Sequence, residues 1–106
     1  MYKWDIKNAV LGGDFNAGCR YVRPREWTGI RLRTDTRFQW VIGDKADTTT
    51  AKSRCPYDRF VIAGRQLQAS YVTNSAKPFR YYVGYKMSRQ QAQKVSDHVP
   101  IEMKLN

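Results

Sequence analysis

The alternation of apolar and polar positions predicts strands in the first and central parts of the chain. Residues 8–15 (NAVLGGDF) form an apolar run closed by acidic and amide residues, which predicts a buried strand that ends in a loop. Residues 57–63 (YDRFVIA) are rich in β-branched and aromatic side chains between Pro56 and Gly64, which predicts a second strand. Residues 67–73 (LQASYVT) alternate well enough to be its antiparallel neighbour, so the two segments suggest a hairpin.

Helix signals lie between these segments and after them. Pro24, followed by polar residues and a tryptophan, suits a short helical turn with proline at its first position. Ser88 and Gln91 have the spacing of a capping box that opens a helix, and residues 99–105 alternate as a terminal strand. Residues 36–42 fit a helix or a strand equally well. The pattern predicts a mixed α and β fold in packed layers.

Length and hydropathy limit the classes of protein that the chain can represent. A chain of 106 residues is one domain at most. It contains no run of about 18 apolar residues, which a membrane helix needs. The first residues, MYKWDIKNAV, lack the apolar segment and small-residue cleavage site of a signal peptide. We therefore expect no membrane partner and no export signal in this sequence.

The charge balance points to a polyanionic partner. The chain has 19 Lys and Arg residues against 9 Asp and Glu residues, for a net charge of +10. A field of that sign attracts phosphate backbones, so nucleic acid is the first partner to consider. The basic residues are scattered along the chain, and a solvated basic surface is the alternative interpretation.

The cysteines leave two possibilities. Cys19 and Cys55 are too few for a closed zinc site, since His98 is the only histidine and such a site needs four ligands. Either a disulfide or two free thiols remain. An even number of cysteines in a small basic domain favours the disulfide and an oxidising compartment.

A first candidate site follows the predicted strand at residues 8–15. Asp14 and Asn16 are two residues apart, so in extended backbone their side chains project to one face. A carboxylate and an amide carbonyl are hard oxygen donors, which suit Mg²⁺, Mn²⁺ or Ca²⁺. The alternative is that both side chains bond backbone groups of a turn, as Asx residues often do.

A second candidate site lies in the segment SDHVP at residues 96–100. Adjacent residues of extended backbone point to opposite faces, so Asp97 and His98 would serve different partners, one a metal and the other a proton. Asp58, at the head of an apolar strand, would be a cap, an ion-pair partner of Arg59, or the carboxylate that orients His98. A single histidine with a purely structural role is the alternative.

Five segments carry a family resemblance across residues 3–105: GDFNAGCRYV, IRLRTD, FQWVIGDKADTT, CPYDRFVIAG and SDHVPIEMKL. In this order they resemble the C-terminal part of deoxyribonuclease I-like enzymes, within the endonuclease/exonuclease/phosphatase superfamily. The resemblance implies a divalent-metal-dependent endonuclease that hydrolyses DNA phosphodiester bonds, with Mg²⁺ or Mn²⁺ and Ca²⁺ as cofactors. It also implies a secreted, extracellular parent family.

The resemblance assigns roles to individual residues. It implies that His98 is a catalytic histidine oriented by Asp58, that Asp14 and Asn16 contact the metal and the phosphate, and that Asp97 is a further metal ligand. It also implies a disulfide between Cys19 and Cys55, and it places Tyr21 and Tyr57 close to the DNA backbone. Asp47 and Thr49 match a structural calcium site. Further hydroxyl positions of the calcium site fall at Ala51, which has no side-chain oxygen, and at Ser53.

What the sequence lacks is as informative as what it matches. Family members are about twice as long and form a four-layer α/β/β/α sandwich, so residues 1–106 resemble a single partial domain, the C-terminal half. Met1 then resembles a fragment boundary or a truncated gene model. The first half would supply a metal-binding glutamate and a second histidine, neither of which has a match here.

Three functions follow from this comparison. The leading one is a nuclease that lacks part of its active site, to be completed by a missing N-terminal half or by a second copy of the chain. One alternative is a catalytically silent DNA-binding fragment. The other is a phosphatase for small substrates, and the cysteines and the positive charge disfavour this phosphatase. We also expect an exposed apolar sheet face, with Val10, Phe60, Ile62 and Val72 as candidates.

Overall fold

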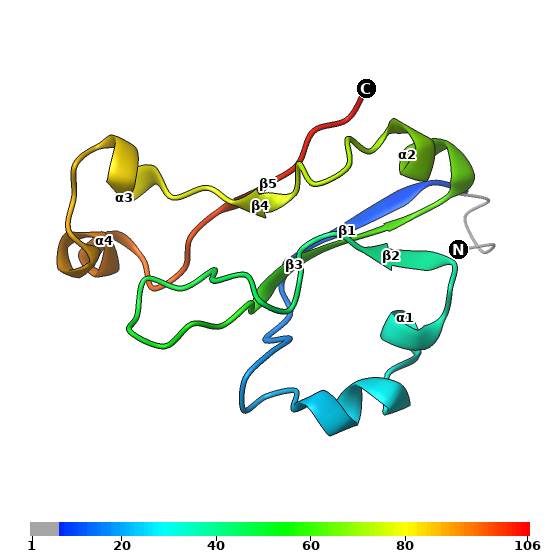
Figure 1. Cartoon of the computed structure of the whole chain (residues 1–106), viewed down its shortest axis with the longest axis horizontal. Helices are drawn as coiled ribbons and strands as arrows, with labels where there is room; N and C mark the ends of the chain where they lie inside the picture. Colours follow the sequence, from blue (N-terminus) through cyan, green and yellow to red (C-terminus); the bar gives the residue numbers. More distant parts are fainter. Residues whose placement is uncertain (1–6) are drawn as a thin grey trace.

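A three-stranded antiparallel sheet forms the centre of the computed structural model, which describes residues 7–106 (Figure 1). Strand β3 (Asp58–Ala63) lies between β1 (Ala9–Asp14) and β2 (Phe38–Trp40). The register places Asp14 directly opposite Asp58 at one end of the sheet. Residues 1–6, which include the first positions of the family resemblance, lie outside the described range.

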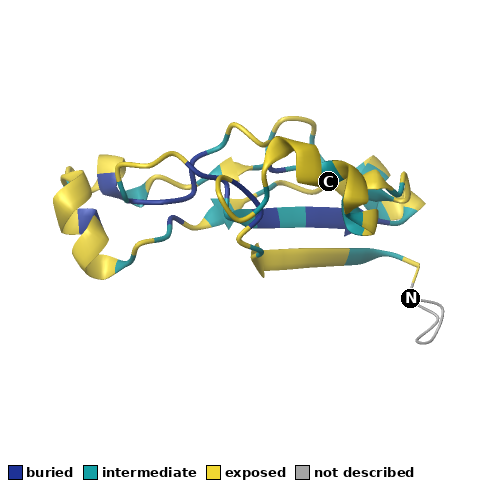
Figure 2. Cartoon of the chain, turned by 90° about the horizontal axis from the view of Figure 1, so that it is seen from below, coloured by how far each residue is buried: buried dark blue, intermediate teal, exposed yellow. Residues whose placement is uncertain are grey.

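Strand β1 is exposed, which corrects the expectation of a buried strand at residues 8–15. Five of its six residues are exposed, among them Val10 at 45% and Leu11 at 37% (Figure 2). β1 is an edge strand, and nothing else among residues 7–106 pairs with its outer side. Ile62, expected on an exposed face, is instead fully buried in the central strand β3. The apolar run correctly predicted a strand but not its exposure.

The expected hairpin after β3 is wrong, because residues Arg65–Ser70 form helix α2. Gly64 begins this helix with a φ of 108°, and a Cβ at that position would collide with the backbone of Lys7. Asn8 then caps the helix from a distance, since the Leu67 N–H donates to Asn8 Oδ1 at 3.0 Å. A side chain 59 residues away therefore satisfies a free N–H of the first turn.

Two of the other helical segments begin where the sequence predicted them, and two more were not predicted. The 3₁₀ helix η2 (Pro24–Gly29) begins at the predicted proline, and α1 (Arg31–Thr34) follows it. Ser88 caps α4 (Arg89–Val95), and the Gln91 side chain accepts from the Ser88 N–H at 2.9 Å, as the capping box predicts. Short helix α3 (Tyr81–Gly84) precedes it.

The C-terminal segment is less regular than the predicted strand at residues 99–105. Only β5 (Ile101–Glu102) is a strand, and it pairs antiparallel with β4 (Lys77–Pro78). A single further bridge joins Tyr71 to Leu105. The ambiguous segment at residues 36–42 contains β2, a strand. The whole is a mixed α and β fold with antiparallel sheets, as the sequence predicts.

The molecule is flat, and most of its buried apolar residues fall into two small groups. It measures 44 × 34 × 23 Å, and its radius of gyration of 15.1 Å exceeds the roughly 13 Å typical of a compact chain of about 100 residues. One group lies in and around β3 and consists of Ile42, Val61, Ile62 and Ala63. The other joins α3, α4 and the segment before β5 and consists of Tyr82, Ala92 and Val99. Between the groups runs a buried polar segment, Asp47 to Thr50.

A buried arginine ties the first loops to the sheet. The Arg59 guanidinium, fully buried, donates to the carbonyl oxygens of Ala17, Ile42 and Pro56 and to Asp44. Trp27 and Trp40 pack edge to face 5.3 Å apart beside it. The Cys19–Cys55 disulfide predicted by the resemblance is also present, and it joins the loop after β1 to the loop before β3. No helix in residues 7–106 has the length and apolar character needed to cross a bilayer.

Candidate active site

His98 and Asp58 form the centre of the candidate site. His98 Nδ1 lies 2.8 Å from Asp58 Oδ2, although the two residues are 40 positions apart. Because a carboxylate only accepts hydrogen bonds, Nδ1 carries the proton and Nε2 stays available. This hydrogen bond raises the pKa of His98 above its ordinary value of 6.5, and the partial burial of the ring opposes the shift without cancelling it. The sequence allowed Asp58 to be a cap, an ion-pair partner of Arg59 or a partner of His98, and in the structure it bonds His98.

Asp14 reaches the same histidine from the neighbouring strand. Its Oδ2 lies 3.5 Å from His98 Nε2, while its Oδ1 accepts the Asn16 N–H at 2.9 Å. Asn16 has a φ of 49°, a left-handed conformation that asparagine tolerates better than most residues. Asp14 therefore closes a turn with one oxygen and faces the imidazole with the other, while its role as a metal ligand stays a prediction.

The remaining predicted ligand, Asp97, lies at the margin of the group. Its side chain is 85% exposed and Oδ1 is 3.8 Å from His98 Nε2. Asp97 and Asp14 therefore both face the Nε2 side of the ring, whereas Asp58 holds the Nδ1 side. Asp97 therefore makes no close hydrogen bond to the ring. The sequence expectation that Asp97 and His98 serve different partners stays a prediction.

The donor atoms of Asp14, Asp58 and His98 form a compact group, all lying within 4.8 Å of one another. Two of the three donors are carboxylates, and Asp97 adds a third nearby. Oxygen-rich sets of this kind suit hard divalent ions such as Mg²⁺ and Mn²⁺. Asp58 is bonded to Nδ1 and only 13% exposed, whereas Asp14 and Asp97 are more exposed and lie on the Nε2 side of the ring.

A buried threonine segment positions these residues, a role that no sequence pattern indicated. The Asp58 N–H donates to Thr48 Oγ1 at 3.1 Å, and the Val99 N–H donates to the Thr48 carbonyl at 2.7 Å. The Thr50 N–H in turn donates to the Asp97 carbonyl at 3.0 Å. Thr49 pairs with His98 in an isolated antiparallel bridge. The three acidic and imidazole side chains from β3 and residues 97–98 thus depend on one buried strand-like segment.

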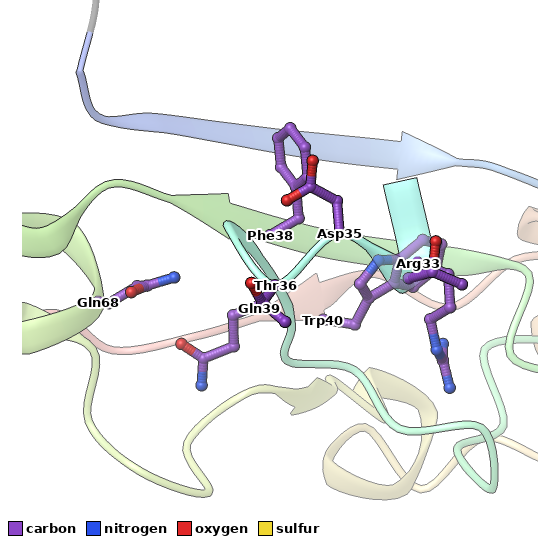
Figure 3. A pocket seen from close by; sticks show the side chains of 8 residues that line it. Arg33, Asp35, Thr36, Phe38, Gln39, Trp40 and Gln68 are labelled. Carbon is purple, nitrogen blue, oxygen red and sulfur yellow. The ribbon is translucent and has the colours of Figure 1, made fainter. Parts of the chain in front are cut away.

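Two cavities bear on the choice of site. One, of about 360 Å³, lies beside the ring of His98 and is also lined by Asp58, Gly13, Tyr81 and Pro100. The other, of about 580 Å³, lies over β2 and shares no lining residue with the His98 group. Figure 3 shows this second cavity, with Phe38 and Gln39 leaving β2 in opposite directions. Its one acidic lining residue, Asp35, is already paired with Arg37, so we assign the chemistry to the cavity beside His98.

The two tyrosines predicted near the DNA backbone lie together. Tyr21 and Tyr57 pack edge to face with ring centroids 5.5 Å apart, and Tyr21 is 51% exposed. The Arg20 guanidinium lies 5.2 Å from the Tyr21 ring centre and donates to its hydroxyl at 3.3 Å. This exposed group combines a π face and a positive charge, both suited to a nucleic acid.

Asp47 and Thr49, the residues of the expected calcium site, are engaged with protein groups. Asp47 Oδ2 accepts from Arg89 at 2.8 Å, and Oδ1 accepts the Thr49 N–H at 3.1 Å. The Thr49 hydroxyl lies 2.8 Å from the Ser53 carbonyl oxygen. Burial alone would raise the pKa of Asp47, but the hydrogen bonds from Arg89 and Thr49 outweigh it and lower that pKa. These contacts do not fit a calcium ion bound through the same oxygens.

Comparison with known proteins finds relatives of one name in several mammals. The chain is 54% identical over 105 residues to a protein of Canis lupus familiaris named deoxyribonuclease-1, and 50% identical over 103 residues to the proteins of that name from Homo sapiens and Ovis aries. These matches cover 97–99% of this chain but only 36–40% of the relatives. No family model matches the chain.

Proposed function

This chain is a homologue of one part of deoxyribonuclease-1, and we propose that it supplies the His98 half of the active site of a divalent-metal-dependent DNA endonuclease. The observation that carries the proposal is the convergence of Asp14, Asp58 and His98, three residues far apart in the sequence, on one point. A structural histidine needs only one partner, whereas His98 has carboxylates on both nitrogens.

His98 would act as a general base toward water. Asp58 holds Nδ1–H, so Nε2 presents a lone pair to the side where Asp14 and Asp97 lie. Water would give a proton to Nε2 while its oxygen attacks the phosphorus of a phosphodiester, and the bond from phosphorus to the leaving oxygen would break. The leaving oxygen needs a proton from a second group. The family resemblance assigns this role to a second histidine, and because His98 is the one histidine of this sequence, we propose that the second group lies outside residues 1–106.

Asp14 and Asp97 would hold the divalent metal, with Asn16 at the same end of β1. When bound, Mg²⁺ or Mn²⁺ supplies charge stabilisation to the phosphate as negative charge develops. The preference among Mg²⁺, Mn²⁺ and Ca²⁺ belongs to the proposal as well. The exposed carboxylates of Asp14 and Asp97 on the Nε2 side of His98 support a divalent metal at this place.

DNA is the proposed substrate, and the net charge of +10 supports a polyanion of this kind. Tyr21 and Tyr57, with Arg20 against Tyr21, would contact its backbone. The disulfide between Cys19 and Cys55 supports a secreted, extracellular protein, because disulfides persist in oxidising compartments.

We propose that residues 1–106 are a single partial domain and one half of a four-layer sandwich. A missing N-terminal half or a second copy of the chain would supply the rest of the site. The exposed apolar residues Val10 and Leu11 of β1 support this, since a central strand of a sandwich would bury them.

A catalytically silent DNA-binding fragment is the second candidate function. It is favoured by the short match, 36–40% of the length of the relatives, and by the single histidine. The loss of one positioned acid or base typically lowers a rate about 10²–10⁴-fold, so a half-site alone could be inactive.

Plasmid nicking by the oxidised chain tests both candidates. The reactions would contain Mg²⁺ with Ca²⁺, or EDTA, and would compare the wild type with His98→Ala and with Gln90→Ala. Gln90 is exposed on α4 and lies outside the site, so its variant controls for handling and folding. The proposal predicts metal-dependent nicking that Gln90→Ala retains and His98→Ala loses.

The opposite outcomes are equally informative. If the wild type binds DNA in a salt-sensitive way without nicking it, the silent fragment is the correct function. Nicking that persists in His98→Ala would contradict the assignment of the base.

A further inference from the structure

The segment that positions the active-site residues is held by an arginine. Arg89, the first residue of α4, donates through one nitrogen to Asp47 Oδ2 at 2.8 Å and to the Thr49 carbonyl at 3.2 Å. These two oxygens come from residues two positions apart on the buried segment. A carboxylate and a backbone carbonyl at such spacing are the oxygen donors that a hard cation would use.

The Asp47 carboxylate depends on this contact. Its side chain is only 7% exposed, and Arg89 is the only charged group that bonds it among residues 7–106. A buried carboxylate without a countercharge is costly, so a cation is required at this position. Ala51 has no side-chain oxygen to offer a metal ion.

We propose that the Arg89 guanidinium takes the place of a structural divalent cation at Asp47 and Thr49, so that the loop of residues 47–55 keeps its shape without calcium. This inference is independent of the proposed nuclease activity. It assigns to α4, a surface helix, the task of fixing the segment that bonds Asp58, Asp97 and Val99.

Limited proteolysis with endoproteinase Lys-C tests the proposal locally. The exposed Lys52 lies in the loop, and the protease cleaves after lysine. The rate of cleavage after Lys52 would be measured in Ca²⁺ and in EGTA for the wild type, Arg89→Gln, Arg89→Lys and Arg65→Gln. Arg65→Gln removes the same charge from an exposed position on α2.

The expected result is a wild-type rate that does not change between Ca²⁺ and EGTA. Arg89→Gln should be cleaved roughly fivefold faster, the upper range for a half-exposed ion pair. Arg65→Gln should match the wild type. Arg89→Lys, which keeps the charge but not the planar group, should lie between the wild type and Arg89→Gln.

Two results would overturn the proposal. One is a wild-type loop that Ca²⁺ protects and EGTA exposes, since a divalent ion would then be needed. The other is an Arg89→Gln loop as resistant as the wild type. If Arg89→Gln fails to fold, Asp47→Asn and Arg89→Lys replace it: the proposal requires faster cleavage in both, and wild-type rates in both reject it.

Discussion

His98 Nδ1 and Asp58 Oδ2 lie 2.8 Å apart and link the end of β3 to the segment before β5. The link depends on Thr48, whose hydroxyl accepts the Asp58 N–H and whose carbonyl accepts the Val99 N–H. The backbone on both sides of the ion pair is therefore fixed by one buried residue. His98 is left only about one-third exposed, with its Nε2 open on the side of Asp14.

Replacing Asp58 by asparagine should lower the pKa of His98. The carboxylate stabilises the imidazolium and raises the pKa above 6.5, so a neutral amide removes the main cause of the shift. An NMR titration of the His98 ring in the presence of EDTA measures this directly. Asp35→Asn, which changes a half-buried carboxylate paired with Arg37, is the control and should leave the titration unchanged. An equal pKa in Asp58→Asn and the wild type would contradict the assigned hydrogen bond.

The same pair gives stability a definite dependence on pH. Because the folded pKa of His98 lies above its ordinary value, the stabilisation is fully present below about pH 6.5 and is lost as the pH rises through the folded pKa. Asp58→Asn should flatten this part of the stability profile, measured as urea midpoints between pH 5 and 9 in EDTA. An unchanged profile in the variant would show that the pair does not couple to folding.

Arg59→Met should destabilise the chain strongly. The methionine fills part of the space, but the carbonyls of Ala17, Ile42 and Pro56 lose their donors in a buried place. We expect a loss of about 3 kcal/mol or more in the free energy of unfolding. Urea denaturation measures it, with Arg37→Met as the control, because Arg37 is an exposed partner of Asp35. Equal midpoints for the two variants would contradict a central role for Arg59.

Asp44 should make the chain sensitive to acid. Burial favours a higher pKa for Asp44, but hydrogen bonds from Arg33 and Arg59 outweigh it and hold the pKa below 3.8. The stabilisation is therefore present above about pH 3.8 and is lost as the pH falls through the folded pKa. The stability difference between the wild type and Asp44→Asn should shrink over that range in urea titrations from pH 6 to pH 2. A constant difference would rule out this ionisation as its source.

The sequence predicted local structure where the signals were local. A run of β-branched and aromatic residues between Pro56 and Gly64 gave β3, and Ser88 with Gln91 gave α4. Residues 67–73 were misjudged because their alternation fits a strand. Asn8 caps α2 from a distant part of the chain, and no local pattern shows that contact.

The candidate site divides in the same way. Asp14, Asp58 and His98 could be named from the sequence, but their meeting depends on the register that sets Asp14 opposite Asp58. Thr48 and Arg89 gave no signal, since a threonine in a polar loop and an arginine at a helix start are ordinary residues. Their roles come from contacts across 10 and 42 positions. The exposure of β1 also could not be predicted, because apolar residues indicate a preference for burial and not what covers them.

The contact of Arg20 with Tyr21 separates charge from stacking in DNA binding. Arg20 donates to the Tyr21 hydroxyl and lies over its ring, and Tyr21 packs against Tyr57. Arg20→Gln should weaken binding and reduce the slope of log affinity against log salt by about 1, because one phosphate contact is lost. Tyr21→Ala should weaken binding with little change of slope, since a π face carries no charge.

Fluorescence anisotropy with a labelled duplex at several salt concentrations measures both quantities. Tyr85→Ala is the matched control, because Tyr85 is 77% exposed and follows helix α3, an element separate from the loops that carry Tyr21 and Tyr57. It should bind as the wild type does. If all three variants bind as the wild type does, the DNA contact does not involve Arg20 or Tyr21.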